Sequence, residues 1–479
     1  MHLRGFRALV VAVWVALALL PCAPSGAQAA QLPFTIGAGQ GVFLHISDIH
    51  FNPFADQTIV RRLIAAPVEQ WAAIFRASRN TPFWDKNQDT TFPLFTSMLA
   101  ATKGPAYDYV LNTGDVLSHD FKDDFIKAGG TESEYGGFVI KTMRFVDRML
   151  KQSFPKSPLI AVLGNNDATC DDYMLAPNDP MLPAIGRDLP AVARHPKALR
   201  DYTMGGSYAV PHPKVPKHDI VVLSDVFLSR KYRDACGQTG TDPGSAELSW
   251  LEWTLYQAKL AGRTVTLAMH IPPGIDSYSS SRSNTCPLKV VSFWQDAYVR
   301  RFLALVARYK DQVRVAFAGH THMDDFRAVA DANGAPLLAT RITPAVTPLF
   351  GNNPAFTAVL YSRTDASVAD YAVFYLANLA KVGPGVAPDW TLLYTFKDTY
   401  KAAGYDAASL AALSNSIKTD DAVRASFLRN FAVAGQSSIN AANLSAFVCA
   451  QTAITPEAFQ SCACPTPAPD PGAANAPPR

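Results

Sequence analysis

Short runs of apolar and β-branched residues alternate along this chain with longer segments of helical character, and this alternation constrains the fold more than any other feature. The runs predict buried strands at residues 42–47, 109–112, 159–163, 220–224, 265–269 and 313–318. The segments between them predict helices, including residues 92–101, 138–151, 246–261 and 293–309. Strands that alternate with helices favour an α/β fold whose sheet is largely parallel within each half of the chain.

Polar side chains that can bind metal ions stand directly after predicted strands. They are Asp48, His50, Asp115, Asn165, His270, His320 and His322. In open α/β sheets, ligands bind beyond the carboxyl ends of the strands. In extended backbone, the i, i+2 spacing of Asp48 and His50 points both side chains the same way, and His320 and His322 share that spacing.

This residue set has a defined metal chemistry. Asp, Asn and His without cysteine suit borderline and harder divalent ions such as zinc, manganese or iron. Seven candidate ligands are too many for one tetrahedral site but fit two ions that share a bridging carboxylate. Each motif alone has a plainer interpretation: the segment with Asp48 and His50 can be a capped turn, and a single His270 is more often a hydrogen-bonded structural histidine. Their shared position at strand ends favours the metal site.

The order D-x-H, G-D, G-N-x-D, H and G-H-x-H resembles the calcineurin-like metallophosphoesterases. The resemblance implies a four-layer β-sandwich flanked by helices, of class α/β (α+β), with a two-metal site. It implies that Asp48, His50 and His322 hold one ion, that Asn165, His270 and His320 hold the other, and that Asp115 bridges them. The ions are expected to be two divalent cations, zinc first, with manganese or iron as alternatives.

A finer resemblance links residues 89–120, residues 390–400 and the C-terminal cysteines to the acid sphingomyelinase and acid-sphingomyelinase-like phosphodiesterase family. It implies phosphodiester hydrolysis by a metal-bridging hydroxide. It also implies two disulfides, Cys449–Cys462 and Cys236–Cys286, and leaves Cys170 and Cys464 unassigned.

Two positions carry the candidate catalytic residues. Asn166 stands where the family usually has a histidine that contacts the substrate phosphate. Asparagine can donate a hydrogen bond to phosphate but cannot transfer a proton, so His119 becomes the candidate for protonating the leaving oxygen. The remaining histidines have plainer interpretations: we expect His45 to pack within the first strand, and His212 and His218 to be solvated.

The chain divides into four expected parts. Residues 1–30 combine basic residues, an apolar stretch and an Ala-x-Ala site, which predicts a signal peptide. Residues 31–388 are expected to form the catalytic domain, residues 389–464 a helical, disulfide-containing appendage, and residues 465–479 a Pro/Ala-rich disordered tail. Six cysteines follow the signal segment, an even number that favours disulfides in an oxidising compartment. We therefore expect a secreted or periplasmic protein.

The sequence predicts a phosphodiesterase for small substrates, of nucleotide or phosphocholine type. Without a saposin-like segment before the catalytic domain, soluble or head-group diesters are favoured over sphingomyelin, which remains one alternative. The second alternative is a non-catalytic envelope binding protein on the same fold. The net charge of +3 is too small to favour a nucleic-acid partner. No segment after the signal is long and apolar enough to span a membrane. We expect a monomer.

Overall fold

The computed structural model describes residues 29–464 apart from 87, 235–239, 283–284 and 332. The expected signal peptide lies outside the described residues except for its last two positions, and the expected tail at 465–479 and Cys236 lie wholly outside them.

Within the described residues, twelve strands form two six-stranded sheets. The first sheet has the order β12-β11-β10-β1-β2-β3. Its strands are β1 Gln40–Ile46, β2 Val110–Asn112, β3 Leu159–Ala161, β10 Ala355–Ser362, β11 Val368–Leu376 and β12 Trp390–Thr395. The strands β1, β2 and β3 are parallel, whereas β10, β11 and β12 continue the sheet with antiparallel pairings.

The second sheet has the order β4-β5-β6-β7-β9-β8. Its strands are β4 Tyr208–Pro211, β5 His218–Val222, β6 Thr264–Ala268, β7 Val313–Ala318, β8 Asp325–Ala330 and β9 Pro336–Ile342. The four strands β5, β6, β7 and β9 are parallel, and antiparallel β4 and β8 lie at the edges. The expected α/β sandwich is therefore confirmed, but both sheets are mixed. The second sheet is largely parallel as expected, whereas half of the first sheet is antiparallel.

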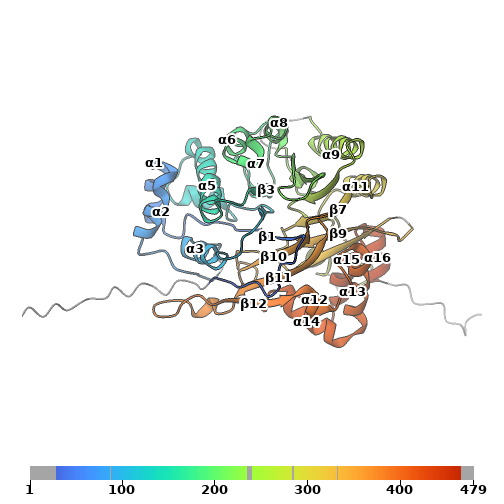
Figure 1. Ribbon diagram of the computed structural model, residues 1–479. Coiled ribbons are helices and arrows are strands. Elements are labelled where there is room, and N and C mark those ends of the chain that lie inside the picture. The colour runs from blue at the N-terminus through green and yellow to red at the C-terminus, as the bar shows by residue number, and fades with distance from the viewer. Residues whose placement is uncertain (1–28, 87, 235–239, 283–284, 332, 465–479) are drawn as a thin grey trace, which may run out of the picture.

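Helices flank the two sheets (Figure 1). In the first half of the chain they are α1 Val60–Ala65, α2 Val68–Ala77, α3 Phe92–Ala101, α4 Phe121–Lys127 and α5 Glu132–Ser153. The next are α6 Met181–Asp188, α7 Pro190–Ala193, α8 Pro196–Gly205, α9 Pro243–Leu260, α10 Ser277–Ser280 and α11 Asp296–Arg308. The last are α12 Phe396–Tyr400, α13 Ala407–Thr419, α14 Asp421–Phe431, α15 Leu444–Thr452 and α16 Pro456–Ala463. In the part of the chain that the structure describes, none of these helices has the length and apolarity to cross a bilayer.

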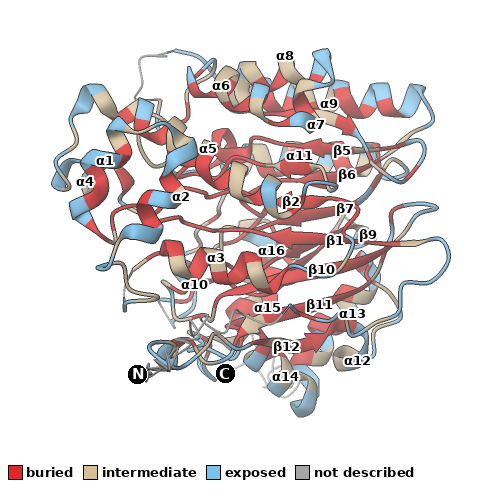
Figure 2. Ribbon diagram, turned by 60° about the vertical axis from the view of Figure 1, so that its left-hand side comes forward, coloured by how far each residue is buried: buried red, intermediate tan, exposed pale blue. Residues whose placement is uncertain are grey.

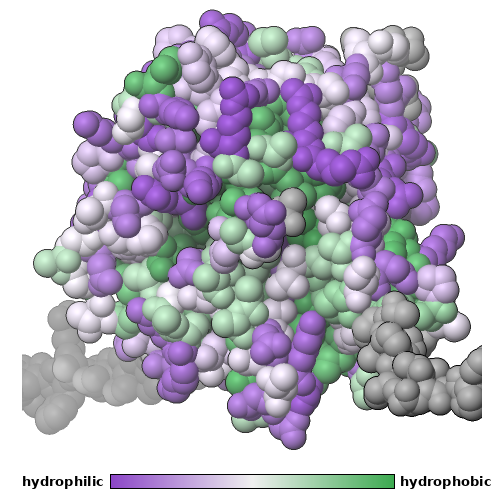
Figure 3. Space-filling view, turned by 90° about the vertical axis from the view of Figure 1, so that its right-hand side faces the viewer, coloured by the Kyte–Doolittle hydropathy of each residue, from purple (hydrophilic) through white to green (hydrophobic). Residues whose placement is uncertain are grey.

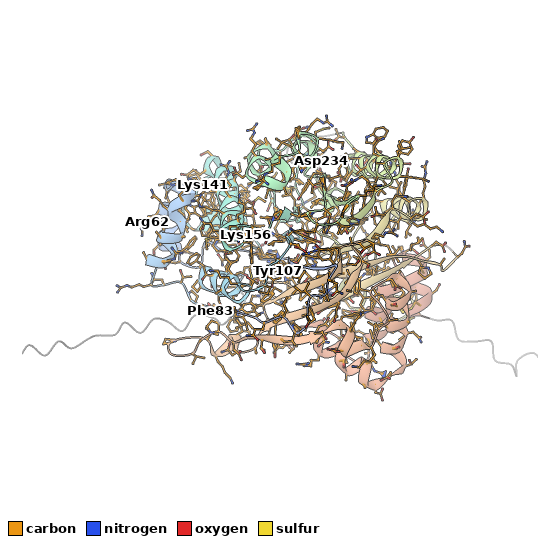
Figure 4. All side chains as sticks on the ribbon, in the orientation of Figure 1. Arg62, Phe83, Tyr107, Lys141, Lys156 and Asp234 are labelled. Atoms are coloured by element: carbon orange, nitrogen blue, oxygen red, sulfur yellow. A yellow bond between two sulfur atoms is a disulfide. The ribbon has the colours of Figure 1, made fainter. Side chains whose placement is uncertain are left out.

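Helix α5 is the longest of the described helices, and its N-terminus carries a capping box in which Thr131 and Glu134 bond each other's backbone N–H. Lys141 on α5, labelled in Figure 4, donates hydrogen bonds to the carbonyls of Ile64 (2.6 Å) and Ala66 (3.1 Å). These carbonyls lie at the end of α1 and have no partner within that helix. The lysine therefore fixes α1 against α5.

The C-terminal segment, expected to be helical from Asp389, begins with a strand. Trp390–Thr395 forms β12, the edge strand of the first sheet. The Trp390 side chain is buried, and its Nε1 donates to Ser97 Oγ at 2.8 Å. Because β12 pairs with β11 and packs on α3, tertiary contacts decide its conformation. The helices then follow from Phe396 onward.

These C-terminal helices share the main hydrophobic core with both sheets. Leu410, Phe427, Phe431 and Phe447 belong to the same buried cluster as the strands β1 and β2. A second cluster fills the space between the second sheet and helices α9 and α11. Figure 2 shows the buried residues concentrated in the strands and on the inward faces of the helices. The face drawn in Figure 3 carries hydrophobic residues around its middle and hydrophilic ones toward its border.

One of the two expected disulfides is present, and the expected pairing of the other is wrong. Cys449 and Cys462 are bonded, with a Cα–Cα distance of 5.7 Å. Cys286 is bonded to Cys464, not to Cys236, with a Cα–Cα distance of 5.8 Å. Pairing depends on which loops meet in space, and the loop with Cys286 lies against the end of α16. Cys170 is also disulfide-bonded.

Candidate metal centre

The loops that follow β1, β2, β3, β6 and β7 carry the residues expected to bind metal. In each sheet these strands are parallel, so their carboxyl ends lie at the same edge. The structure brings all seven expected side chains to one place between the two sheets. They are Asp48, His50, Asp115, Asn165, His270, His320 and His322.

The backbone of these loops differs from the extended chain that the sequence suggested. Strand β1 ends at Ile46, and Asp48 and His50 have φ angles of 50° and 44°. Asp115, His320 and His322 also lie in the left-handed region, with φ of 54°, 70° and 63°. Residues other than glycine rarely adopt this conformation, and when they do they cluster at functional sites. Five of the seven positions therefore carry backbone strain that the surrounding fold must hold.

Two glycines let the loops approach one another. A Cβ on Gly319 would overlap Ser47 Oγ and lie 2.5 Å from Asp48 Oδ2. A Cβ on Gly164 would overlap Asp115 Oδ1. The glycines of the G-H-x-H and G-N-x-D motifs are therefore needed because a neighbouring carboxylate occupies the space of a side chain.

The first group of side chains surrounds His50. His50 Nε2 lies 3.5 Å from Asp115 Oδ2 and 3.2 Å from His322 Nε2. His322 Nε2 lies 3.5 Å from Asp48 Oδ1. All four side chains are buried.

The second group surrounds His270, which is also buried. His270 Nε2 lies 3.2 Å from Asp115 Oδ2, 3.1 Å from Asn165 Oδ1 and 3.2 Å from His320 Nδ1. Asp115 is thus common to both groups. A single carboxylate between two sets of ligand atoms is the arrangement that a bridged pair of cations requires.

The hydrogen bonds of the histidine rings indicate which ring nitrogens are left to bind cations at this centre. His50 Nδ1 donates to Leu117 O, and His270 Nδ1 donates to Thr113 O, both at 2.8 Å. A neutral imidazole has one N–H, so Nε2 of His50, whose pKa burial lowers to about 4, faces the centre with its lone pair. Nε2 of His270 does the same once a metal ion displaces its proton. Asn165 Nδ2 donates to Asp172 Oδ1 at 2.7 Å, which turns its Oδ1 inward.

At His50 the lone pair of Nε2 therefore faces a carboxylate oxygen of Asp115. Nitrogen lone pairs and carboxylate oxygens cannot satisfy one another without a positive charge between them. The residues present fit divalent cations, because nitrogen and oxygen ligand atoms converge on two neighbouring positions that share Asp115.

Burial and charge set the ionisation of the group. Burial lowers the pKa of His50 to about 4, and it holds the pKa of His320 and His322 well below the ordinary value. Burial opposes charge on both Asp115 and His270, but their mutual attraction keeps the pKa of Asp115 well below its usual range and raises the pKa of His270 to about 10. The centre thus keeps a carboxylate ionised in a buried position and attracts positive charge.

Two buried carboxylates support the loops and were not identified from the sequence as functional. Asp167 accepts hydrogen bonds from the backbone N–H groups of Val116 (2.8 Å) and Gly164 (2.9 Å), which ties the loops after β2 and β3 together. Asp225 accepts from the N–H groups of His270 (3.1 Å) and Ile271 (2.7 Å). Asp225 directly follows a predicted strand, which is the signal that could have identified it.

His119 lies at the edge of the first group. Its ring stacks on that of His50, with 3.9 Å between centroids, and its side chain is 28% exposed. Its Nδ1 lies 3.1 Å from Asp89 Oδ2, and its backbone N donates to the same oxygen at 2.7 Å. Thr347 Oγ1 donates to the other oxygen of Asp89 at 2.9 Å. Burial lowers the pKa of His119, but the Asp89 carboxylate outweighs it, and the net pKa is raised.

Asn166 lies beside Asp115. Its backbone N and its Nδ2 donate to the two oxygens of Asp115, both at 2.8 Å. Both residues expected to act in catalysis, His119 and Asn166, therefore adjoin the seven expected ligands. Sequence analysis missed Asp89, which lies 30 positions before His119 and orients its ring. Only the fold brings the two residues together.

Comparison with known proteins agrees with this geometry. The family described as calcineurin-like phosphoesterase matches residues 41–324. The chain is 25% identical over 432 residues to the cyclic GMP-AMP phosphodiesterase SMPDL3A of Mus musculus, covering 88% of each chain. It is 25% identical over 398 residues to acid sphingomyelinase-like phosphodiesterase 3b of Homo sapiens, covering 80% of this chain and 81% of that one. It is 27% identical over 340 residues to sphingomyelin phosphodiesterase of Homo sapiens, covering 66% of this chain and 48% of that one. The family resemblance expected from the sequence is thus confirmed.

Proposed function

The chain belongs to the calcineurin-like phosphoesterases and is a metal-dependent phosphoric ester hydrolase, and we propose that it hydrolyses small phosphodiesters at the centre around Asp115. The family fold implies two divalent metal ions. The alternative of a non-catalytic binding protein is set aside, because the relatives are named as phosphodiesterases.

One observation carries the proposal: potential metal-ligand atoms converge from five loops on a shared, buried carboxylate. In the proposed assignment, Asp115 would be the ligand shared by two cations. The other six ligands form two sets, with Asp48, His50 and His322 in one and Asn165, His270 and His320 in the other. Zinc suits the nitrogen-rich donor set, with manganese and iron as alternatives. When bound, such a pair of ions supplies an activated water at neutral pH and offsets the charge of the transferred phosphoryl group.

The protein's own catalytic groups lie on the His119 side. Because Nδ1 of His119 is held by Asp89, its Nε2 is the atom left to give a proton to the departing oxygen. Asn166 Nδ2, now bonded to Asp115, is placed to donate a hydrogen bond to a phosphoryl oxygen. Asp89 is a positioning residue for His119, in the way that a carboxylate orients a catalytic imidazole.

Relatives support the substrate class. One relative is named a cyclic GMP-AMP phosphodiesterase and another a sphingomyelin phosphodiesterase, and both names describe phosphodiester cleavage. We favour soluble diesters of nucleotide or phosphocholine type, with sphingomyelin as the alternative. The disulfides Cys286–Cys464 and Cys449–Cys462 fit an oxidising compartment, which supports a secreted or periplasmic enzyme. The proposed enzyme acts as a monomer.

The purified protein should be assayed with bis-p-nitrophenyl phosphate, p-nitrophenyl phosphate and sphingomyelin, each with and without a chelator. We expect the diester to be hydrolysed faster than the monoester, the chelator to remove this activity, and added zinc or manganese to restore it. Sphingomyelin as the best of the three substrates would favour the lipid alternative. Absence of hydrolysis in every metal-loaded sample would contradict the proposal.

A further inference from the structure

An exposed aromatic ring stands on the loop between β9 and β10. Within residues 343–354, all of which the structure describes, Phe350 is the only exposed residue, with 55% of its surface accessible. Gly351 N donates to Pro348 O at 3.1 Å, which closes a tight turn with Phe350 at its third position. Gly351 has a φ of 87°, a conformation that glycine adopts without strain.

This turn is held from both sides. Asn352 Nδ2 donates to Thr347 O at 2.9 Å, and Thr347 itself is bonded to Asp89. On the other side, Gln436 N donates to Gly351 O at 2.8 Å. Phe350 is thus an exposed hydrophobic side chain on a braced backbone. Exposure of a large apolar ring has a free-energy cost in water, and when the backbone presents it rigidly it is suited to contact a ligand.

The ring lies beside the residues proposed to act on the leaving group. Its centroid is 4.6 Å from that of His322 and 5.4 Å from that of His119. In the proposed function His119 gives a proton to the departing oxygen, so the group attached to that oxygen must pass close to Phe350.

The surroundings of the ring favour a planar group over an acyl chain. The side chains next to Phe350 in this direction are imidazoles, and the rest of the loop is buried or half-buried. A lipid chain needs a contiguous apolar surface, which one ring does not provide. A planar group needs only one aromatic face on which to stack.

We infer that Phe350 is a specificity-determining residue that stacks on the leaving group and selects phosphodiesters whose leaving group is planar and aromatic, such as a nucleobase-bearing alcohol or a nitrophenol. The inference rests on the proposed function and deepens it.

The test compares Phe350→Leu with Phe350→Tyr in the metal-loaded full chain. Leucine keeps an apolar side chain but removes the planar face, whereas tyrosine keeps the face. The substrates are bis-p-nitrophenyl phosphate and thymidylyl-thymidine, whose leaving groups carry a ring, and glycerophosphocholine, whose leaving groups do not. Trp253→Leu is the control, because Trp253 is also 55% exposed but lies on the surface helix α9.

We expect Phe350→Leu to lower kcat/KM for the two aromatic diesters about 10-fold, within the range that loss of one base–aromatic stack gives, mainly through KM. Activity on glycerophosphocholine should change less than about 2-fold, and Phe350→Tyr and Trp253→Leu should match the wild type on all substrates. Equal losses on all three substrates, or no loss on the aromatic ones, would overturn the inference while leaving the proposed function intact. A wild type that hydrolyses none of the diesters would instead refute the proposed function, and the inference with it.

Discussion

His212 and His218 form a second buried cluster, which we call the inter-sheet pair. They are buried about as deeply as the histidines of the metal centre, but their ring nitrogens have different neighbours. His218 Nδ1 lies 2.7 Å from Thr264 Oγ1, and its Nε2 lies 2.9 Å from Thr266 Oγ1. His212 Nδ1 accepts hydrogen bonds from the backbone N–H groups that follow it, including that of Val215 at 3.1 Å. These three nitrogens of the inter-sheet pair therefore face hydroxyl or N–H groups that complete an ordinary hydrogen bond.

At the metal centre a buried ring nitrogen meets a carboxylate instead. His50 Nε2, a lone-pair atom, faces the Asp115 carboxylate at 3.5 Å. Burial lowers the pKa of His212 to about 4 and that of His218 to about 3, so burial alone does not distinguish structural histidines from ligands. The chemical nature of the atoms that face each ring nitrogen distinguishes them.

Replacing the shared carboxylate should have the largest effect. We expect Asp115→Asn to lower turnover of bis-p-nitrophenyl phosphate about 10³-fold or more, because it removes several kcal/mol of charge stabilisation from both proposed ions. Metal content by mass spectrometry should fall in parallel. The matched control is Asp147→Asn, a buried carboxyl on α5 whose pKa burial raises to about 7. Near-normal activity of Asp115→Asn would contradict the ligand assignment.

Removal of the proposed acid comes next. His119→Ala should slow substrates with poor leaving groups by about 10²–10³-fold and p-nitrophenyl esters much less, since nitrophenolate departs without a proton. Asp89→Asn should show the same pattern more weakly, because it leaves the ring in place but loses the charge that orients it. The measurement is kcat/KM across leaving groups of rising pKa. A uniform loss over that series would count against the acid role of His119.

Changes in the inter-sheet pair should affect stability and spare catalysis. His218→Leu leaves the hydroxyls of Thr264 and Thr266 without their partner, and we expect it to lower the free energy of unfolding by about 1–3 kcal/mol. Urea unfolding measures this loss. Metal content and kcat/KM should stay within about 2-fold of the wild type. Loss of metal from this variant would break the distinction between the two histidine clusters.

The smallest expected effect is on the stability of the fold at low pH. His212 and His218 have pKa values of about 4 and about 3 in the folded protein, below the ordinary 6.5, because burial disfavours the charged ring. The unfolded chain therefore binds more protons, and stability rises with pH. This contribution is complete above about pH 6.5 and falls as the pH drops from there toward about 3. Thermal unfolding at a series of pH values should show a shallower slope for His218→Leu, and an identical slope would contradict the prediction.

The sequence predicts the strands that carry the centre well, because each ligand directly follows a buried apolar run. Asp48 after β1 and Asp115 after β2 are found in this way. The backbone conformation of Asp48 was not predictable, since its left-handed φ is imposed by loops from elsewhere in the chain. The expectation that His212 and His218 are solvated is wrong, because both are buried. Neighbouring prolines suggested a loop where strand β5 begins.

Contacts that span long stretches of chain escaped prediction altogether. Asp89 orients His119, and Thr347, which bonds Asp89, is 258 positions further along. The partner of Cys286 proved to be Cys464, at a separation of 178 positions. Neither local periodicity nor residue type carries information about such pairs, which depend on the completed packing of both sheets.

The bond from Gln436 to the Phe350 turn ties substrate choice to the end of the chain. A protein cut before α14 would still encode every proposed ligand, yet its Phe350 turn would lose the support of Gly351 O by Gln436. The segment after α14 thus supports the proposed substrate contact although it lies far along the chain from the metal ligands proposed here.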